Sequence, residues 1–419
     1  MTFDLPTEFE LQELDIDGND VLGLFASISV FENIYSPLIT GHVTLLETDT
    51  ARFIEKYKIE GNEKFKFNVK TAKDSYNFEG YLNGLRNKTN DQQMTAYTFD
   101  FTSETMRKNE QVFITKAYKE KQPKQIVQDM IDKMGGQQDK VQGSGKPMTI
   151  LPSNKRPYDV IKYVLTHGVV DDANASEGEG RNLDEKAEGN GGFMCWATAD
   201  GFRFNTIEKV MEGSAGGNAG TFKSQMMNKG QSLSEMMESI VAYDFQVMGD
   251  IQAKLRSGAF KSKLISFDLD KLEYKEFMYD NTEKATEKQQ MAVEEDFTRI
   301  FVAPHSNERF ENKCDKTQNS KYDQRRYWIT QSPGGENTHD DIQGTFTLYP
   351  QCKMRAGDKM EVKIGRVTSG QGAGTYDKKH SGKYIVSEVG HHFSNVDFRG
   401  FTRVSVIRAT DQQDDSSAG

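Results

Sequence analysis

The sequence predicts an α+β protein that is mainly β, with two similar antiparallel β-barrel-like domains and α+β domains inserted between them. Three observations lead to this fold class. Apolar and polar residues alternate through much of residues 25–101, which is typical of half-buried strands. The apolar spacing becomes helical in two later segments, each opened by a proline. The end of the chain then resembles its beginning.

Length and composition are those of a globular protein with several domains. At roughly 100–200 residues per domain, 419 residues correspond to about two to four domains. Only 36% of the residues are hydrophobic, but 26 Phe and 16 Tyr can bury enough apolar area for real cores. The net charge of -10 argues against general affinity for nucleic acid, which depends on clustered Lys and Arg. No secretory signal and no apolar run of the ~20 residues that span a bilayer is present, so we expect no membrane insertion.

The first predicted domain, residues 1–105, is a compact and mostly antiparallel β domain. Its expected strands cover residues 25–31, 41–46, 65–69, 77–82 and 95–101. Turns are expected at Gly61-Asn62, Asn83-Gly84 and Asn90-Asp91, and a short helix over residues 49–57.

The second predicted domain, residues 106–231, is an α+β domain. Helices are expected to open at Pro123 and Pro157, because proline suits the first turn of a helix. Two strands joined by the Asp200-Gly201 turn predict a hairpin. Residues 171–192 are rich in Gly, Glu, Asp and Asn and have little to bury, which predicts a flexible acidic loop.

The remaining chain divides into three parts. Residues 232–341 are an inserted α+β region, and residues 342–410 are a second tube-like β domain that earlier residues complete. Residues 411–419 are a polar tail. Within the inserted region we expect a helical turn from Ser232, strands over residues 242–248 and 258–269, and a solvated helix over residues 282–297. Residues 212–220 are polar and rich in glycine, and residues 314–341 are mostly polar.

An internal repeat links the first and last domains. Residues 44–46 lead into residues 59–69 near the start, as residues 347–349 lead into residues 354–364 near the end. Both copies place a Gly-Asn or Gly-Asp turn before an alternating strand, and residues 77–82 and 97–101 then match residues 381–386 and 401–406. The alternative is that small β domains share such punctuation by chance. If the repeat is real, a cyclic trimer presents six similar domains around one axis.

The sequence contains no pattern that indicates catalysis, a cofactor or a metal. No histidine lies in a His-Glu-x-x-His motif or accompanies a Gly-x-Ser-x-Gly elbow, and Cys195, Cys314 and Cys352 fit no zinc or disulfide framework. His391 and His392 follow each other in an expected strand, so their side chains should point to opposite faces. The Gly-rich residues 369–374 lack a phosphate-loop pattern, and the acidic pairs lie in polar surroundings that do not raise a carboxyl pKa. We therefore predict that the protein is not an enzyme.

Several segments, taken in order, resemble the baseplate hub protein of contractile-tailed bacteriophages, the family that joins the tail tube to the cell-puncturing spike. Residues 36–41 with residues 61–63 resemble its first tube domain, and also the N-terminal part of secretion-system spike proteins. Residues 200–207 resemble its hairpin, residues 258–269 a segment of such hubs, and residues 381–386 its last tube-domain strand. The positions that carry the resemblance are Gly61, Asn62, Gly201, Phe202, Phe204, Gly258, Phe260, Lys263, Leu264, Gly357, Asp358, Gly382 and Tyr384.

The resemblance implies a structural hub, built as a homotrimer with two tube-like domains per chain. Its partners would be the tail tube protein above, a trimeric spike below and other baseplate subunits, with DNA only as passing cargo. The location implied is the tail baseplate of the virion, after assembly in the host cytoplasm. No cofactor or metal is implied. Residues 171–192, 212–220 and 314–341 have no counterpart in the family pattern.

Two alternatives remain open from the sequence. The first is a spike adaptor of a bacterial contractile injection or secretion system; such chains usually continue into a β-helical spike, whereas this one ends in a polar tail, so we expect a separate spike subunit. The second is a cell-wall hydrolase with carboxylates in the central region. For the hub, we hypothesise an acidic channel that lets DNA slide without adhering.

Overall fold

The computed structural model describes residues 3–48, 56–90, 94–170, 192–224, 231–246, 251–269, 272–280, 297–305, 343–365, 376–377 and 379–408. Its strands are β1 (Phe9–Ile16), β2 (Asn19–Asp20), β3 (Phe25–Asn33), β4 (Thr40–Thr48), β5 (Lys64–Thr71), β6 (Ser75–Asn90), β7 (Met94–Ser103), β8 (Tyr118–Lys121), β9 (Gln138–Val141), β10 (Met148–Ile150), β11 (Phe193–Thr198), β12 (Gly201–Thr206), β13 (Asn218–Ser224), β14 (Ile240–Gln246), β15 (Lys261–Asp268), β16 (Glu273–Asp280), β17 (Arg299–His305), β18 (Gln343–Leu348), β19 (Lys359–Ile364), β20 (Gly382–Ser394) and β21 (Arg399–Arg408). Its helices are η1 (Leu22–Leu24), α2 (Glu104–Gln111), α3 (Pro123–Lys133), α4 (Pro157–His167), α5 (Ile207–Met211), α6 (Leu233–Met237) and α7 (Ile251–Ser257).

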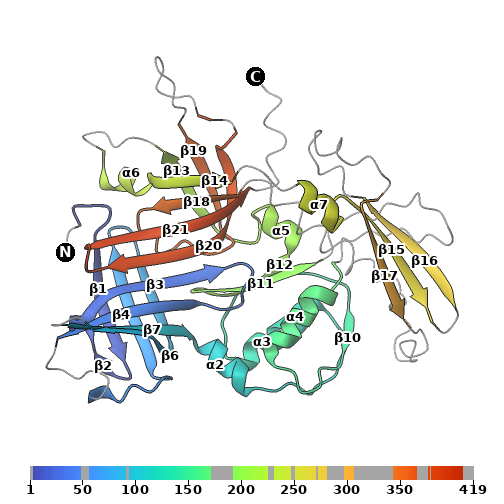
Figure 1. Cartoon of the computed structure of the whole chain (residues 1–419), viewed down its shortest axis with the longest axis horizontal. Helices are drawn as coiled ribbons and strands as arrows, with labels where there is room; N and C mark the ends of the chain where they lie inside the picture. The colour runs from blue at the N-terminus through green and yellow to red at the C-terminus, as the bar shows by residue number, and fades with distance from the viewer. Residues whose placement is uncertain are drawn as a thin grey trace.

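A large, curled, mostly antiparallel sheet of 13 strands dominates the molecule and confirms the mainly β prediction (Figure 1). Its strands follow the order β14-β18-β21-β20-β3-β4-β7-β6-β5-β1-β2, and β19 and β13 branch from β20. The predicted alternation is visible in β4, where Gly41, Val43 and Leu45 are buried between less buried neighbours. Because β3 pairs with β20, strands from the two ends of the chain form one continuous sheet.

Two sets of five strands in this sheet are paired in the same antiparallel order. In the first set, β3 pairs with β4, β4 with β7, β7 with β6 and β6 with β5. In the second set, β14 pairs with β18, β18 with β21, β21 with β20 and β20 with β19. The sequence repeat falls on corresponding strands of the two sets. The outer neighbours differ, since β1 runs antiparallel to β5 whereas β13 runs parallel to β19.

Two irregularities of the first set recur in the second, while a third, across Arg86 in β6, has no counterpart in β20. The β3·β4 ladder shifts register across Ala26, and the β14·β18 ladder shifts across Val241. The β6·β7 ladder shifts across Asn83, and the β20·β21 ladder shifts across Ser387. A bulge inserts one unpaired residue and bends its strand at that point. Bulges at corresponding places therefore indicate that the two sets share local backbone geometry as well as strand order.

One predicted turn in the first set is wrong. Asn83-Gly84 has turn chemistry, but β6 continues through it to Asn90 and these residues lie at the bulge. Pairing with the full length of β7 outweighs the local turn preference, because cross-strand contacts decide strand conformation more than intrinsic propensity does. The strand now extends beyond its partner β5, which ends its pairing with β6 at Tyr81.

The middle of the chain forms a smaller α+β layer that lies beside the first strand set in Figure 1. The predicted helix starts are confirmed, because Pro123 and Pro157 occupy first-turn positions of α3 and α4. The predicted hairpin is confirmed as β11 and β12, and β9 joins it by parallel pairing with β12. The buried faces of α3 and α4 join β11, β12 and the first strand set in one hydrophobic core, while the second set has a core of its own.

The inserted region contains a separate three-stranded sheet, which Figure 1 shows at the far side of the molecule from β1. The strand expected over residues 258–269 is β15, paired with β16 and β17, and it is preceded by the unpredicted helix α7. Residues 218–220 of the Gly-rich stretch belong to β13, and the helical turn after Ser232 is α6. Residues 171–191, 281–296, 314–341, 369–374 and 411–419, on which several expectations fall, lie outside the described residues, as does most of the helix expected over residues 49–57.

Candidate assembly interface

The predicted Gly-Asn and Gly-Asp turns have the same backbone geometry, displaced by one residue. Asn62 and Gly357 both have φ of +85°. The N–H of Asn62 donates to the carbonyl of Leu82 at 2.8 Å, and the N–H of Gly357 donates to that of Val386 at 2.7 Å. Gly357 therefore corresponds to Asn62, and the two turns place β5 and β19 in the same way on their neighbours. Asparagine and glycine are the residues that tolerate this left-handed conformation best.

Gly357 carries a second constraint that Asn62 lacks. A Cβ at position 357 would lie 2.5 Å from the Trp196 ring, which is fully buried. We expect Gly357→Ala to lower the free energy of unfolding by about 2–4 kcal/mol, since left-handed strain and overpacking add. Urea unfolding of Asn62→Ala is the matched control, with an expected loss of about 1 kcal/mol from strain alone. Equal losses in the two variants would contradict the assigned contact.

An ionic joint, buried except at Asp139 and Asp200, connects the first strand set, the central hairpin and the second strand set. It consists of Glu32, Asp139, Trp196, Asp200, Arg203, Arg355, Ala356 and Asp358. Arg203 in β12 donates to Asp139 at 2.7 Å and to Asp358 at 2.8 Å. Arg355 forms two hydrogen bonds with Asp200, at 3.0 and 3.1 Å. These paired charges hold the hairpin against the turn that leads into β19.

Glu32 is the most deeply buried acid of this joint. It lies in β3 and accepts the N–H groups of Ala199 at 2.9 Å and Ala356 at 3.2 Å. Its carboxylate lies 3.9 Å from the Arg355 guanidinium. Burial raises the pKa of Glu32 to about 7, although Arg355 and the two N–H groups act in the opposite direction. The joint thus contains a carboxyl group whose charge changes near neutral pH.

The structure distributes the predicted motif positions over five places. Gly61 and Asn62 form the turn before β5, and Gly357 and Asp358 form the corresponding turn before β19. Gly201, Phe202 and Phe204 lie in the hairpin, whose phenylalanines are buried, and Gly382 and Tyr384 lie in β20. The turn before β19 meets the hairpin through Arg203 and Asp358, and it meets β20 through the backbone hydrogen bonds that Gly357 and Asp358 form with Val386.

The fifth group is Gly258, Phe260, Lys263 and Leu264, of which the first two lie between α7 and β15 and the last two lie in β15 of the three-stranded sheet. Phe260 and Leu264 are buried, and Lys263 pairs with Glu276 at 2.7 Å. These residues stabilise that sheet and lie away from the ionic joint (Figure 1). Sequence reasoning missed Glu32, Arg203 and Arg355, because a single charged residue in an alternating strand or a polar turn carries no signal of burial.

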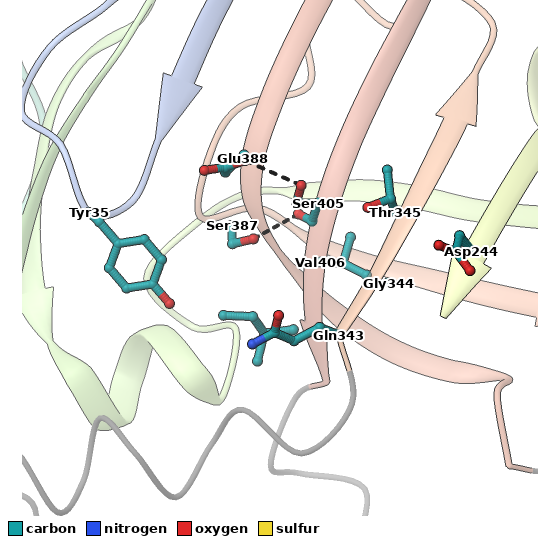
Figure 2. Close-up of a pocket in the computed structure, with 10 residues that line it drawn as sticks. Tyr35, Asp244, Gln343, Gly344, Thr345, Ser387, Glu388, Ser405 and Val406 are labelled. Atoms are coloured by element: carbon teal, nitrogen blue, oxygen red, sulfur yellow. Dashed lines mark hydrogen bonds between the residues drawn. The ribbon is translucent and has the colours of Figure 1, made fainter. Parts of the chain in front are cut away.

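A polar hollow of about 310 Å³ lies on the second strand set, over β14, β18, β21 and β20 (Figure 2). Ser387, the bulged residue of β20, donates to the carbonyl of Ser405, whose hydroxyl donates to Glu388. The face carries both signs of charge, since Asp244 and Glu388 are exposed and so is Arg403. The expected acidic channel lining therefore stays a prediction.

The two strand sets differ in how much of their edges is covered. The C-terminal half of β20 pairs with β3 as well as β21, and Val389 there is 1% exposed. The corresponding half of β6 pairs with β7 alone among the described strands, and its equivalent residue Leu85 is 46% exposed. Likewise Ile28 in β3 is 0% exposed, whereas its equivalent Tyr243 in β14 is 43% exposed. Each chain therefore contains one covered junction, in which β3 pairs with β20. It also has two uncovered edges, on β14 and on the C-terminal half of β6, that correspond to the two sides of this junction.

Within the described ranges, no group of three or more His, Cys, Asp or Glu side chains could hold a metal ion. His391 is buried against Thr402, whereas His392 contacts Ser29, so the two side chains point to opposite faces as predicted. No helix in the same part of the chain has the length and apolar character needed to cross a membrane.

Comparison with solved structures shows which class of protein shares this architecture. The 43 kDa tail protein of prophage MuSo2 from Shewanella oneidensis aligns with a TM-score of 0.55 and 10% identity, over 96% of this chain and 98% of that chain. The tail protein from Neisseria meningitidis MC58 aligns with a TM-score of 0.53 and 7% identity, over 96% and 98%. An E. coli type VI secretion system component, c3393, aligns over 96% of this chain and 76% of that chain at 8% identity, but its TM-score of 0.42 is too low to support an argument. No protein-family model and no curated protein matches the sequence.

The chain therefore has the fold of phage tail proteins over nearly its whole length. This confirms, at the level of fold, the resemblance inferred from the order of the sequence motifs.

Proposed function

We propose that this protein is the structural hub of a contractile phage tail baseplate. Three chains form a ring of six similar tube-like β domains, which joins a hexameric tail tube to a trimeric spike and encloses the DNA channel. The supporting observation is the repeat of strand order, bulges and turn geometry between the two strand sets. A chain with two equivalent units presents pseudo-sixfold symmetry to one partner while a threefold axis relates the chains.

The proposed division into domains follows the same logic. The first tube-like domain covers residues 1–105, and the second, residues 342–410, takes β13 and β14 from earlier residues. The α+β domain of residues 106–231 and the inserted region of residues 232–341 lie between them in the chain. The ionic joint favours a rigid relation between both strand sets and the hairpin, as a load-transmitting ring requires.

The solution mass of the purified protein tests this proposal. Light scattering, with and without a candidate spike protein, is expected to give the mass of three 47.4 kDa chains in at least one of the two conditions. A single-chain mass under both conditions, across the accessible concentration range, would contradict the ring.

A further inference from the structure

We propose that the free edge of β14 pairs with the C-terminal half of β6 in the next copy of this chain, in the register that β3 and β20 adopt within one chain. This inference rests on the proposed ring and names the contact that builds it. The uncovered segment of β6, residues 84–90, is called the β6 extension below.

The template for this contact is the covered junction. Within the chain, β3 and β20 pair antiparallel, with Phe31 opposite Gly390 and Ser29 opposite His392. Ser29 corresponds to Asp244 by its ladder position on the neighbouring strand. His392 corresponds to Thr89 by ladder position on β21 and β7, once the bulge at Arg86, which β20 lacks, is counted. Repeating the junction between chains therefore places Asp244 of one copy opposite Thr89 of the next.

The same mapping defines the rest of the register. Phe245 lies opposite Lys88, Tyr243 opposite Asn90, and Gln246 opposite Asn87. In the covered junction the corresponding pairs are Val30 with His391, Ile28 with Phe393, and Phe31 with Gly390. All these residues belong to the described parts of β14 and β6.

The side chains of the two edges suit each other chemically. Lys88 gives the β6 extension a positive charge, since Arg86 is already paired with Asp100 at 3.0 Å. Asp244 gives β14 a negative charge. The Lys88 ammonium already lies 5.4 Å from the Tyr97 ring centroid, and Phe245 would add a second aromatic ring beside it. A carboxylate at position 244 can accept the Thr89 hydroxyl, as Ser29 contacts His392 at 2.9 Å in the covered junction.

The exposed edges also indicate that a partner strand is needed. Among the described residues, β14 forms a ladder only with β18, β13 reaches only Ser239 just before it through a bridge from Lys223, and the β6 extension pairs only with β7. An exposed strand edge is a template for pairing with another chain. The two edges lie on different strand sets of one chain, so the contact between copies is head-to-tail. Copies joined in this way leave no edge unpaired only when they form a closed ring.

Paired cysteines test the register directly. In a Cys314→Ser background, with Cys195 and Cys352 buried, the double variant Thr89→Cys and Asp244→Cys is oxidised and resolved by denaturing electrophoresis. We expect disulfide-linked species of up to three chains and none larger. The matched control, Ser29→Cys with His392→Cys, occupies the same register inside the chain and should form a bond with no gain in mass. Lys88→Cys with Asp244→Cys places the thiols on opposite faces and should form none.

The outcomes separate the junction from the ring. Three-chain particles by light scattering without a cross-link, while the internal control pair oxidises, would overturn the junction and leave the proposed hub standing. Single-chain particles would overturn both. Cross-linked species beyond three chains would support the strand pairing but contradict closure into a three-chain ring.

Discussion

Replacing Arg203 by methionine is expected to lower the free energy of unfolding by about 3–5 kcal/mol, because it leaves buried acids without their cation. The Arg203 side chain is 4% exposed and that of Asp358 is 7% exposed, and they meet at 2.8 Å. Asp358 also accepts the N–H of Gly217 at 2.7 Å, so its carboxylate is held in place and cannot turn to solvent. Urea unfolding of the variant measures the loss.

Lys116→Met is the control for that variant. Lys116 pairs with Asp129 at 3.2 Å, but the two side chains are 56% and 31% exposed. An exposed ion pair of this kind contributes less than about 1 kcal/mol. If the two methionine variants lost the same stability, the ionic joint would not hold the strand sets and the hairpin together.

The second large effect concerns pH. The pKa of Glu32 is about 7 in the folded protein, against its ordinary value of 4.5. The folded protein therefore retains a proton that the unfolded chain has released, so the stabilising contribution is complete below pH 4.5 and is lost as pH rises through 7. This difference corresponds to about 3 kcal/mol. Relative to the wild type, Glu32→Gln should gain about that much stability between pH 4.5 and 8.

Taking the difference in stability between the wild type and Glu32→Gln cancels the contributions of the other titrating groups. Burial lowers the pKa of His391 to about 3, so this histidine stabilises the fold above pH 6.5 and that contribution falls as pH falls toward 3. Its slope opposes that of Glu32, but it is present in both proteins and cancels in the difference. Chemical unfolding at a series of pH values gives the result. A constant difference between wild type and Glu32→Gln would show that Glu32 does not titrate in this range.

The strands and the repeat could be predicted from the sequence because their signals are local. Alternation within residues 41–46 or 95–101 needs no knowledge of the partner strand, and the proline starts of α3 and α4 are equally local. The Asn83-Gly84 turn failed because its outcome depends on β7, which lies later in the chain. Turns and bulges favour similar residues, and only the pairing of β6 with β7 distinguishes the two here.

The ionic joint could not be predicted, because its contacts join distant parts of the chain. Glu32 accepts N–H groups from residues 167 and 324 positions away. In the sequence it is one charged residue after an apolar strand, which equally suits a solvent-facing end. The two uncovered strand edges could not be predicted from the sequence for a related reason. The β6 extension and the matching half of β20 differ in exposure only because β3 covers one of them.

Electron microscopy of the assembled particle tests the central claim most directly. If the two strand sets are equivalent units of a ring, class averages down its axis should show a continuous wall with six similar lobes, in a particle of three chains. Three separate lobes with gaps between the chains would contradict the account, because β14 and the β6 extension would then face solvent.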